Sequence, residues 1–322
     1  MIERRVLGSS GLEVSCLALG AMTFGGRMPP ISNVEAADAE EIVERALEAG
    51  VNFIDTADAY SGGESEEILA PVLARHRDDL VIASKVGMAV RGALAPLSRA
   101  NVLASVEGSL RRLGTDHLDV LYLHRPDRST PVGETFDALE ELVSRGLVGT
   151  VGLSNFTAAE SGFALGRQRA LGRVEPTSVQ IYWSLVGREV EHEIVPMCDR
   201  LGLGVVVWSA LASGYLAGRS DGRRSAFPFP PVDDARGQEV LRELRGIAAA
   251  TGATPAQVAL AWVLRRRAVT SVIVGVSSLA QLDENLGAAT LELDDAQVAA
   301  LDQVSALAPV YPVWWERAMG VT

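Results

Sequence analysis

Four side chains that can hold or transfer a proton lie near the ends of apolar segments. Asp55, Lys85 and His124 each end a short apolar run, and Tyr60 follows Asp55 in the connection to the next amphipathic stretch. Each has an ordinary explanation on its own, as a cap, a solvated rim residue, a packing residue or a partner for a loop carbonyl. A lysine ending an apolar strand, however, needs a carboxylate nearby, because an unpaired buried charge is costly. Asp55 can supply it, so we expect the four side chains to converge.

This set of groups suits proton donation to a carbonyl oxygen. The ordinary pKa of a tyrosine is about 10, and a nearby ammonium lowers it. We therefore expect Lys85 to lower the pKa of Tyr60 towards neutrality and make it a general acid. Asp55 would hold the lysine and tune its charge, while His124 would orient the carbonyl or share the proton. This chemistry fits reduction of a carbonyl by a hydride donor.

Two other kinds of enzyme fit the sequence poorly. A hydrolase is disfavoured because the chain has no G-x-S-x-G motif and no evident nucleophile–base pair. A zinc enzyme is disfavoured because the four histidines form no H-x-H pair at a strand end. They are His76, His117, His124 and His192. We therefore predict no metal ligands.

Short apolar runs alternate with longer amphipathic stretches along the chain, and these elements must position the four side chains. The expected strands are residues 17–20, 51–55, 80–85, 118–124, 150–153, 177–181, 204–208 and 271–275. The expected helices after them are residues 35–49, 63–75, 99–113, 133–146, 157–170, 189–201, 238–251 and 279–288.

This alternation predicts an α/β fold, a (β/α)8 TIM barrel that spans residues 1–322 as a single domain. Strand–helix alternation indicates parallel strands with right-handed crossovers, and eight units are the number that closes a barrel. An open doubly wound sheet is the alternative, weakened because no G-x-G-x-x-G follows the first strand. In a barrel the active site lies where the strands end, which would bring Asp55, Lys85 and His124 to one rim.

Several segments lie outside the eight units. Residues 6–7 and 13–14 flank a Gly-Ser-Ser-Gly turn and predict an N-terminal β-hairpin. A loop over 219–237 and a second helical stretch over 255–267 separate the last two strands. Residues 294–305 predict an extra C-terminal helix that begins at an Asp294 cap.

The tail after this helix is rich in aromatic residues. Tyr311, Trp314 and Trp315 need a surface to cover. They would pack on the outside of the barrel or close the substrate pocket, whose other walls we expect to be Met22, Phe24 and Met88.

Composition limits the partners and the compartment. The 322 residues are 48% hydrophobic, and 29 Lys and Arg against 41 Asp and Glu give a net charge of −12. So acidic a surface argues against nucleic acid and anionic membranes as partners. The two cysteines, Cys16 and Cys198, lie in apolar stretches, as in a reducing cytoplasm. No signal peptide is read, and the uncharged run 201–218 suits a buried strand and a Gly-rich loop better than a membrane helix.

The ordered motifs of the chain resemble those of the aldo-keto reductase family over essentially its whole length. The segments that carry the resemblance are residues 19–22 (LGAM), 52–60 (NFIDTADAY), 83–85 (ASK), 121–127 (LYLHRPD), 152–156 (GLSNF), 180–182 (QIY), 208–211 (WSAL) and 275–278 (GVSS). The resemblance implies Tyr60 as the general acid, tuned by Lys85 and Asp55, with His124 orienting the substrate. It also implies a hydride from a nicotinamide cofactor.

The resemblance also assigns a cofactor site. Ser154, Asn155 and Gln180 match positions that bond the nicotinamide carboxamide, and Trp208 matches the aromatic that stacks on its ring. The remaining implied cofactor residues are Gly20, Ala21, Met22 and Asp55 at the first two strands, Ser209, Leu211, Gly214 and Arg219 near the diphosphate, and Gly275, Ser277, Gln281, Glu284 and Asn285 near the adenosine.

One departure concerns the coenzyme phosphate. Many relatives carry Lys at the Gly275 position and Arg at the Gln281 position, which grip the 2′-phosphate of NADP. This version is similar to that of the voltage-gated potassium channel beta subunits, which use NADP. Arg219, Arg223 and Arg224 could supply the missing charge, or they could only solubilise their loop.

Two functions follow. The first is an NADP(H)-dependent oxidoreductase that reduces an aldehyde or ketone to an alcohol, with a small-molecule carbonyl substrate. The second is a cofactor-binding regulatory or redox-sensing subunit with little turnover. The presence of all four groups, Asp55, Tyr60, Lys85 and His124, favours the enzyme. The physiological substrate and the oligomeric state stay open.

Overall fold

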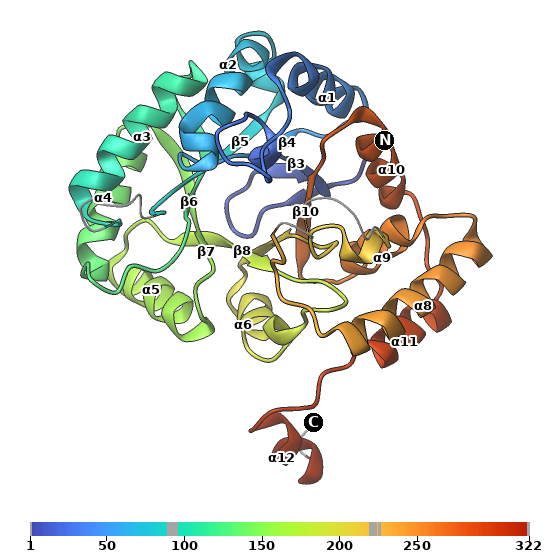
Figure 1. The fold of residues 1–322 in the computed structure, drawn as a ribbon. Coiled ribbons are helices and arrows are strands. Elements are labelled where there is room, and N and C mark those ends of the chain that lie inside the picture. Colours follow the sequence, from blue (N-terminus) through green and yellow to red (C-terminus); the bar gives the residue numbers. More distant parts are fainter. Residues whose placement is uncertain (1, 89–95, 219–223, 225–226, 321–322) are drawn as a thin grey trace.

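A computed structural model describes residues 2–88, 96–218, 224 and 227–320. Eight parallel strands close into a barrel in chain order, with the last strand paired to the first (Figure 1). They are β3 (Leu17–Gly20), β4 (Phe53–Asp55), β5 (Val81–Val86), β6 (Leu118–Leu123), β7 (Val148–Ser154), β8 (Pro176–Tyr182), β9 (Gly204–Trp208) and β10 (Val269–Gly275). The predicted (β/α)8 barrel is confirmed, and the alternative open sheet is wrong.

Helices surround the barrel and cover the outer face of its strands (Figure 1). They are α1 (Ala36–Glu48), α2 (Glu64–His76), α3 (Arg99–Leu113), α4 (Val132–Ser144), α5 (Ala158–Leu171), α6 (Ile194–Leu201), α8 (Asp234–Thr251), α9 (Pro255–Leu264), α10 (Leu279–Leu286) and α11 (Asp295–Val304). Local sequence fixes several ends. Thr157, Thr254 and Asp294 form capping boxes with the third residue of their helices. Gly114 and Gly202 end α3 and α6 in the left-handed conformation that glycine adopts without strain.

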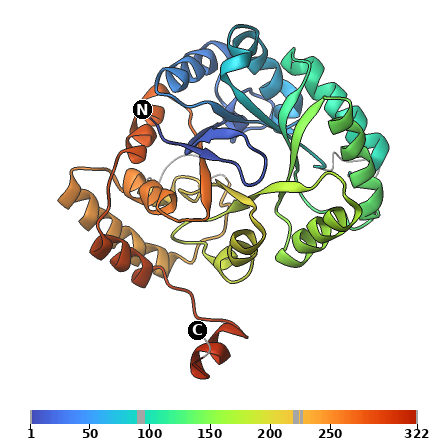
Figure 2. The same cartoon turned by 180° about the vertical axis from the view of Figure 1, so that it is seen from behind.

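The predicted N-terminal hairpin closes one end of the barrel. Strands β1 (Arg4–Val6) and β2 (Glu13–Ser15) pair antiparallel and lie across the barrel opening in Figure 2. Leu7 and Val14 are fully buried among the side chains that fill the barrel interior, Tyr122 among them. A Cβ on Gly8 would lie 2.0 Å from the Thr177 carbonyl oxygen, so only glycine fits this contact.

The helix after the long loop begins earlier than predicted. Helix α8 starts at Asp234 rather than at residue 238, because Asp233 caps it by accepting bonds from the backbone N–H groups of Ala235 and Arg236. Its first turn is polar and contains Gly237, which hides the apolar periodicity. A Cβ on Gly237 would lie 2.2 Å from the Tyr215 hydroxyl, so the glycine is required by packing.

The predicted extra helix α11 is present, and the tail after it forms a short helix that the sequence did not indicate. Helix α12 (Val313–Ala318) lies apart from the barrel in both views (Figures 1 and 2). Tyr311, Trp314 and Trp315 are 71%, 50% and 46% exposed. In this structure the tail therefore neither packs on the barrel nor closes its rim, which corrects both expectations.

No single helix within the described ranges is long and apolar enough to cross a bilayer, and the one pair that would reach that length together, α8 with α9, is bent by 96°. No group of three or more His, Cys, Asp or Glu side chains among the described residues is placed to hold a metal ion.

Candidate active site

The four predicted side chains meet at the rim formed by the carboxyl ends of the strands. Asp55 ends β4, Lys85 is the last residue but one of β5, and His124 directly follows β6. Tyr60 opens a short 3-10 helix, η2 (Tyr60–Gly63), in the loop after β4. The Tyr60 and His124 rings lie edge to face, with centroids 5.8 Å apart.

Lys85 is the centre of this cluster, and its side chain is fully buried. Its ammonium donates to an Asp55 carboxylate oxygen, to the Thr56 carbonyl at 2.9 Å and to the Tyr60 hydroxyl oxygen at 3.0 Å. Burial lowers the pKa of Lys85, but the neighbouring Asp55 and Tyr60 outweigh it and raise the pKa overall. Lys85 is therefore an ammonium at neutral pH.

The Tyr60 pKa differs in direction from the prediction. Burial raises it, and this effect exceeds the lowering by the Lys85 ammonium. The expectation that Lys85 would bring the pKa towards neutrality considered the charge alone and left out desolvation. Tyr60 therefore keeps its proton at neutral pH. Because Lys85 donates to the phenol oxygen, the Tyr60 O–H remains available to another acceptor.

His124 is held as a neutral imidazole. Burial, with the positive charges of Lys85 and Arg125, lowers its pKa to about 3. Its Nδ1 atom is buried and has no hydrogen-bond partner within the described part of the chain. A neutral imidazole carries one N–H donor, so this ring can orient a carbonyl oxygen but holds no ionisable proton at neutral pH.

The residues expected at the nicotinamide end also reach this rim. Asn155 has a left-handed backbone (φ 61°), and its side-chain amide donates to the His124 carbonyl at 2.9 Å and to the Ser154 hydroxyl at 3.0 Å. Gln180 donates to the second Asp55 oxygen at 2.6 Å. The amides are thus tied to the cluster around Lys85 itself, a link that motif matching did not predict.

Trp208 lies within a stack of aromatic rings at the end of β9. Tyr182 lies on one side at 5.2 Å between centroids, and Phe229 stacks on it at 6.0 Å with 13° between the planes. Phe229 is held by Ser213, whose hydroxyl donates to the Phe229 carbonyl at 2.6 Å. Phe229 therefore lies against one face of the Trp208 indole in this structure.

The segment after Trp208 has an unusual backbone. Ser209, Ala212 and Ser213 all have positive φ values, as does Gly214. The Ser209 hydroxyl accepts from the Ser213 backbone N–H at 3.1 Å, which holds this turn, and Leu211 lies within it. A turn of this kind exposes backbone groups at the rim, which suits a diphosphate.

The residues expected at the adenosine end gather around the start of α10. Gly275 pairs with Gly20 across β10 and β3, and nothing lies within 4 Å of where its Cβ would be. Gln281 accepts from the Ser277 backbone N–H at 2.9 Å, and Asn285 is buried on the next turn. The Glu284 carbonyl accepts from Gln257 at 2.8 Å, so this residue is fixed to α9.

Two observations support the fit of these residues to a nicotinamide dinucleotide. The Trp208 indole nitrogen is buried and has no hydrogen-bond partner among the described residues. Open space lies in front of Gly275, beside the first turn of α10, and helix starts favour phosphate groups.

On the first strands, Ala21 and Met22 form the 3-10 turn η1 (Ala21–Thr23) directly after Gly20.

Of the three loop arginines, Arg224 lies within the described part of the chain. Arg219 and Arg223 lie outside the described residues. Arg224 donates to the Pro230 carbonyl at 2.9 Å and lies over the Tyr215 ring, with its guanidinium carbon 5.1 Å from the ring centroid. Its charge faces no carboxylate in any ion pair of the described residues.

The expected substrate walls need one correction. Met88 is exposed at the rim and Met22 is partly exposed, but Phe24 is fully buried in the core between strands and helices. Phe24 therefore supports the rim from below and does not face a substrate.

Sequence reasoning missed a second buried cluster behind the rim. Glu66 is fully buried, accepts from the Ser84 hydroxyl at 2.6 Å and pairs with Arg112 at 2.7 Å. Asp58 lies beside them, and burial and the Glu66 charge raise its pKa to about 6. In the sequence, Glu66 is one of three glutamates in a helix's first turn, so nothing distinguished it from a solvated residue.

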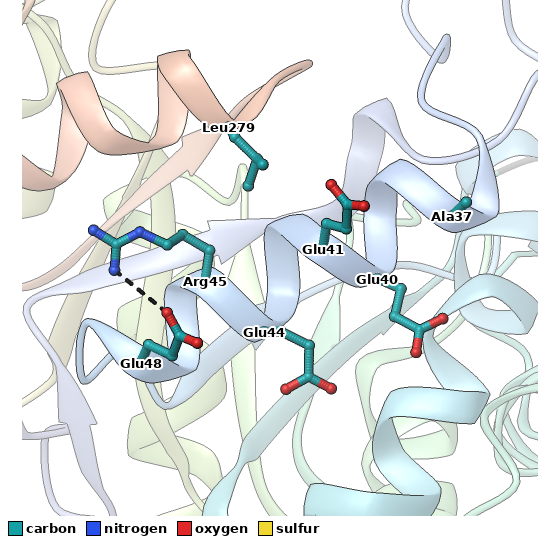
Figure 3. Close-up of a pocket in the computed structure, with 7 residues that line it drawn as sticks. All are labelled: Ala37, Glu40, Glu41, Glu44, Arg45, Glu48 and Leu279. Atoms are coloured by element: carbon teal, nitrogen blue, oxygen red, sulfur yellow. Dashed lines mark ion pairs between the residues drawn. The ribbon is translucent and has the colours of Figure 1, made fainter.

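A surface groove on α1 takes no part in this site (Figure 3). Three of its four glutamates are in ion pairs: Arg75 binds both Glu40 and Glu44 at 2.7 Å, and Arg45 lies 3.9 Å from Glu48. None of the predicted site residues lines it.

Comparison with known proteins identifies the class. A model described as the Aldo/keto reductase family matches residues 16–306. "Aldo-keto reductase AMT2" of Alternaria alternata is 34% identical over 332 aligned positions, covering 92% of this chain and 90% of its own. "Probable aldo-keto reductase 1" of Glycine max is 34% identical over 301 positions, covering 90% of this chain and 85% of its own.

These matches place the chain among the oxidoreductases built on a (β/α)8 barrel. It belongs to the aldo/keto reductase family, whose members generally use a nicotinamide cofactor and act on small-molecule carbonyl compounds.

Proposed function

We propose that this protein reduces an aldehyde or ketone to an alcohol with NADPH, and that Tyr60 is the proton donor. One observation carries the proposal: Lys85 donates to both Asp55 and the Tyr60 oxygen, which leaves the phenol proton free to bond a carbonyl at the rim. No nucleophile in the cluster competes with this chemistry.

The three linked side chains would stabilise the charge that develops as the proton leaves. Tyr60 holds its proton at neutral pH because burial raises its pKa. When the phenol gives that proton to the carbonyl oxygen, the tyrosinate oxygen is 3.0 Å from the Lys85 ammonium. Asp55 keeps this ammonium in place, and Gln180 in turn holds Asp55.

His124 would orient the substrate. Its pKa of about 3 keeps the ring neutral, so its one N–H can donate to the same carbonyl oxygen as Tyr60. Two donors that converge on one oxygen fix the carbonyl plane and polarise the bond. Asn155 holds the His124 backbone through the bond to its carbonyl.

NADPH, when bound, would supply the hydride to the carbonyl carbon. We assign its nicotinamide end to Ser154, Asn155, Gln180 and Trp208. We assign its diphosphate to Ser209, Leu211, Gly214 and Arg219, and its adenosine to Gly275, Ser277, Gln281, Glu284 and Asn285. Gly20, Ala21, Met22 and Asp55 would complete the wall at the first two strands.

The test is the Tyr60→Phe variant, whose activity is measured as the consumption of NADPH with a simple aromatic aldehyde. Loss of the general acid should lower kcat by about 10²–10⁴-fold, while the Kd for NADPH changes little because Tyr60 is outside the assigned cofactor set. Tyr122→Phe is the matched control, since it removes a hydroxyl inside the same barrel, where it bonds Ser178 at 3.0 Å.

Two outcomes would contradict the proposal. Turnover of Tyr60→Phe within about threefold of wild type would remove Tyr60 from the mechanism. Tight NADPH binding by the wild type with no turnover across a panel of aldehydes and ketones would instead favour a regulatory or redox-sensing subunit.

A further inference from the structure

The turn that carries Tyr60 has a strained backbone. Ser61, Gly62 and Gly63 follow Tyr60 with φ values of 50°, 66° and 95°, so three successive residues are left-handed. Ser61 is not a glycine, is buried and adopts this conformation with its hydroxyl unpartnered among the described residues. Such a backbone persists only where its surroundings hold it.

Two contacts hold the turn at its two ends. Before Tyr60, the Asp58 backbone N–H donates to the Lys85 carbonyl at 3.2 Å, which ties the segment to β5. After Tyr60, Gly63 lies directly against Arg112 of α3, because a Cβ at Gly63 would be 2.7 Å from the Arg112 Cδ. The Arg112 side chain thus limits the position of the turn at its far end.

Arg112 is itself fixed to the strand that carries Lys85. Its Nε donates to Glu66 at 2.7 Å, and the other Glu66 oxygen accepts from the Ser84 hydroxyl at 2.6 Å. Ser84 and Lys85 are neighbours on β5, so their side chains point to opposite faces of the strand. The contacts that link Gly63, Arg112, Glu66 and Ser84 therefore lie on the outer side of β5. The Tyr60–Lys85 contact lies on its inner side.

We propose that Arg112 is a positioning residue for proton donation: its contacts with Gly63 and Glu66 fix the distance between the Tyr60 hydroxyl and Lys85. The inference rests on the proposed role of Tyr60 as the general acid. Arg112 acts through Tyr60 and touches neither the substrate nor the cofactor. A displacement of about 1 Å at a reacting group can lower a rate about 10²-fold, so loss of this support is expected to lower kcat.

The experiment is a double-mutant cycle of Arg112→Met with Tyr60→Phe, measured as kcat at saturating NADPH and aldehyde. Arg111→Met is the matched control, because Arg111 is the exposed neighbour on the same helix. We expect Arg112→Met to lower kcat about 10–100-fold in the wild-type background and less than about threefold in the Tyr60→Phe background, since a displaced phenylalanine has no proton to misplace. The NADPH Kd should stay within about twofold of wild type in both.

A spectroscopic measurement without cofactor complements the cycle. The ring signal of Tyr60 in ¹³C-tyrosine-labelled protein, assigned by its loss in Tyr60→Phe, should shift in Arg112→Met and stay in place in Arg111→Met. If Arg112→Met does not fold, Arg112→Lys, which keeps a positive charge beside Glu66, takes its place in both measurements.

The outcomes separate the two proposals. Equal losses in kcat in both backgrounds, or no loss and no shift of the Tyr60 signal, would overturn the positioning role of Arg112. Failure of the proposed function appears separately, as full activity of the Tyr60→Phe variant alone.

Discussion

At the scale of single residues, burial and charge set three different protonation states within one cluster. Lys85 is charged because Asp55 and Tyr60 outweigh its burial, while Tyr60 stays protonated because burial outweighs Lys85. His124 stays neutral because its burial and its cationic neighbours act in the same direction. An ammonium, a phenol and a neutral imidazole are the states from which carbonyl reduction would start.

The His124 ring should not titrate over the physiological range. Its pKa of about 3 predicts that its imidazole signals in an NMR titration stay constant from pH 8 down to about pH 4. A midpoint for His124 near pH 6.5 would contradict the neutral-donor role.

The low pKa of His124 should also make the free energy of unfolding depend on pH. In the unfolded chain His124 gains a proton near pH 6.5, but in the folded protein it does not until about pH 3, so its contribution to stability is present above pH 6.5 and is lost as the pH falls. Relative to His124→Gln, the wild type should lose about 1.4 kcal/mol of unfolding free energy per pH unit between about pH 6 and 4. Urea unfolding at several pH values measures this difference.

Asp58 should make the free energy of unfolding depend on pH in the opposite direction. Its folded pKa of about 6 lies above the ordinary 3.8, because burial and Glu66 disfavour its charge. The folded state therefore binds the extra proton between these values, and stability falls as the pH rises from about 4 to 6. Asp58→Asn should be more stable than wild type above pH 6, by about 1–3 kcal/mol, and similar to it near pH 4.

The positive charge of Arg112 lowers the Asp58 pKa and so opposes the effect of burial. In Asp58→Asn, the neutral side-chain amide can still accept a hydrogen bond from Arg112, but the attraction between opposite charges is lost. A lower melting temperature of Asp58→Asn at pH 8 would show that the Arg112 attraction, rather than burial, dominates at this position.

At the scale of elements, the sequence predicted the strands and helices that follow a repeated pattern. Apolar runs rich in Val and Ile mark strands that are buried on both faces, and eight of them imply one rim at which their last residues meet. Asp55, Lys85 and His124 could be grouped for that reason alone. The single-letter pattern also revealed the Asp294 cap and the hairpin, because both depend on local residue types.

Features that depend on contacts between distant segments were not predictable. The left-handed turn after Tyr60 packs against Arg112, which is far along the chain, and Glu66 pairs with Ser84 across two separate elements. The desolvation that raises the Tyr60 pKa is likewise a property of the folded rim. The stacking of Phe229 on Trp208 could not be predicted, because the loop sequence that contains Phe229 has no fixed periodicity.

The loop after β9 carries the prediction on coenzyme choice. We expect NADPH to be preferred over NADH, with the preference due to the loop arginines, since the Gly275 and Gln281 positions hold no charge. Arg223→Ala with Arg224→Ala should weaken NADPH binding by about 1–3 kcal/mol, or roughly 5–150-fold, and leave NADH nearly unchanged. Fluorescence titration of both coenzymes measures this, with Arg242→Ala on α8 as the control. Equal weakening of both coenzymes, or of neither, would contradict the prediction.

At the scale of the whole molecule, the tail stands apart from the barrel. Among the described residues, no hydrogen bond or ion pair joins residues 307–320 to the rest of the chain, whereas Ser305 is held by Arg188 at 2.7 Å. Deletion of residues 307–322 should therefore leave the Tm and the NADPH affinity nearly unchanged.

The same deletion should remove most of the tryptophan fluorescence that iodide quenches. Trp314 and Trp315 are about half exposed, whereas Trp262 and Trp183 are buried and Trp208 is only partly exposed. KM values for bulky and small carbonyls should keep their ratio. A selective rise in KM for bulky carbonyls would show that the tail returns to the rim when substrate binds, and a large fall in Tm would show that it packs on the barrel.

The hairpin that lies across one end of the barrel has a consequence for proton supply. Leu7 and Val14 seal that end, and packed apolar side chains fill the interior between them and Lys85. This packing closes the route to the Lys85–Asp55 pair from below. In the proposed mechanism, the tyrosinate would therefore recover its proton from the side on which substrate enters. Substrate and solvent protons would then share one opening, and a product that leaves slowly would also delay the reprotonation of Tyr60 for the next turnover.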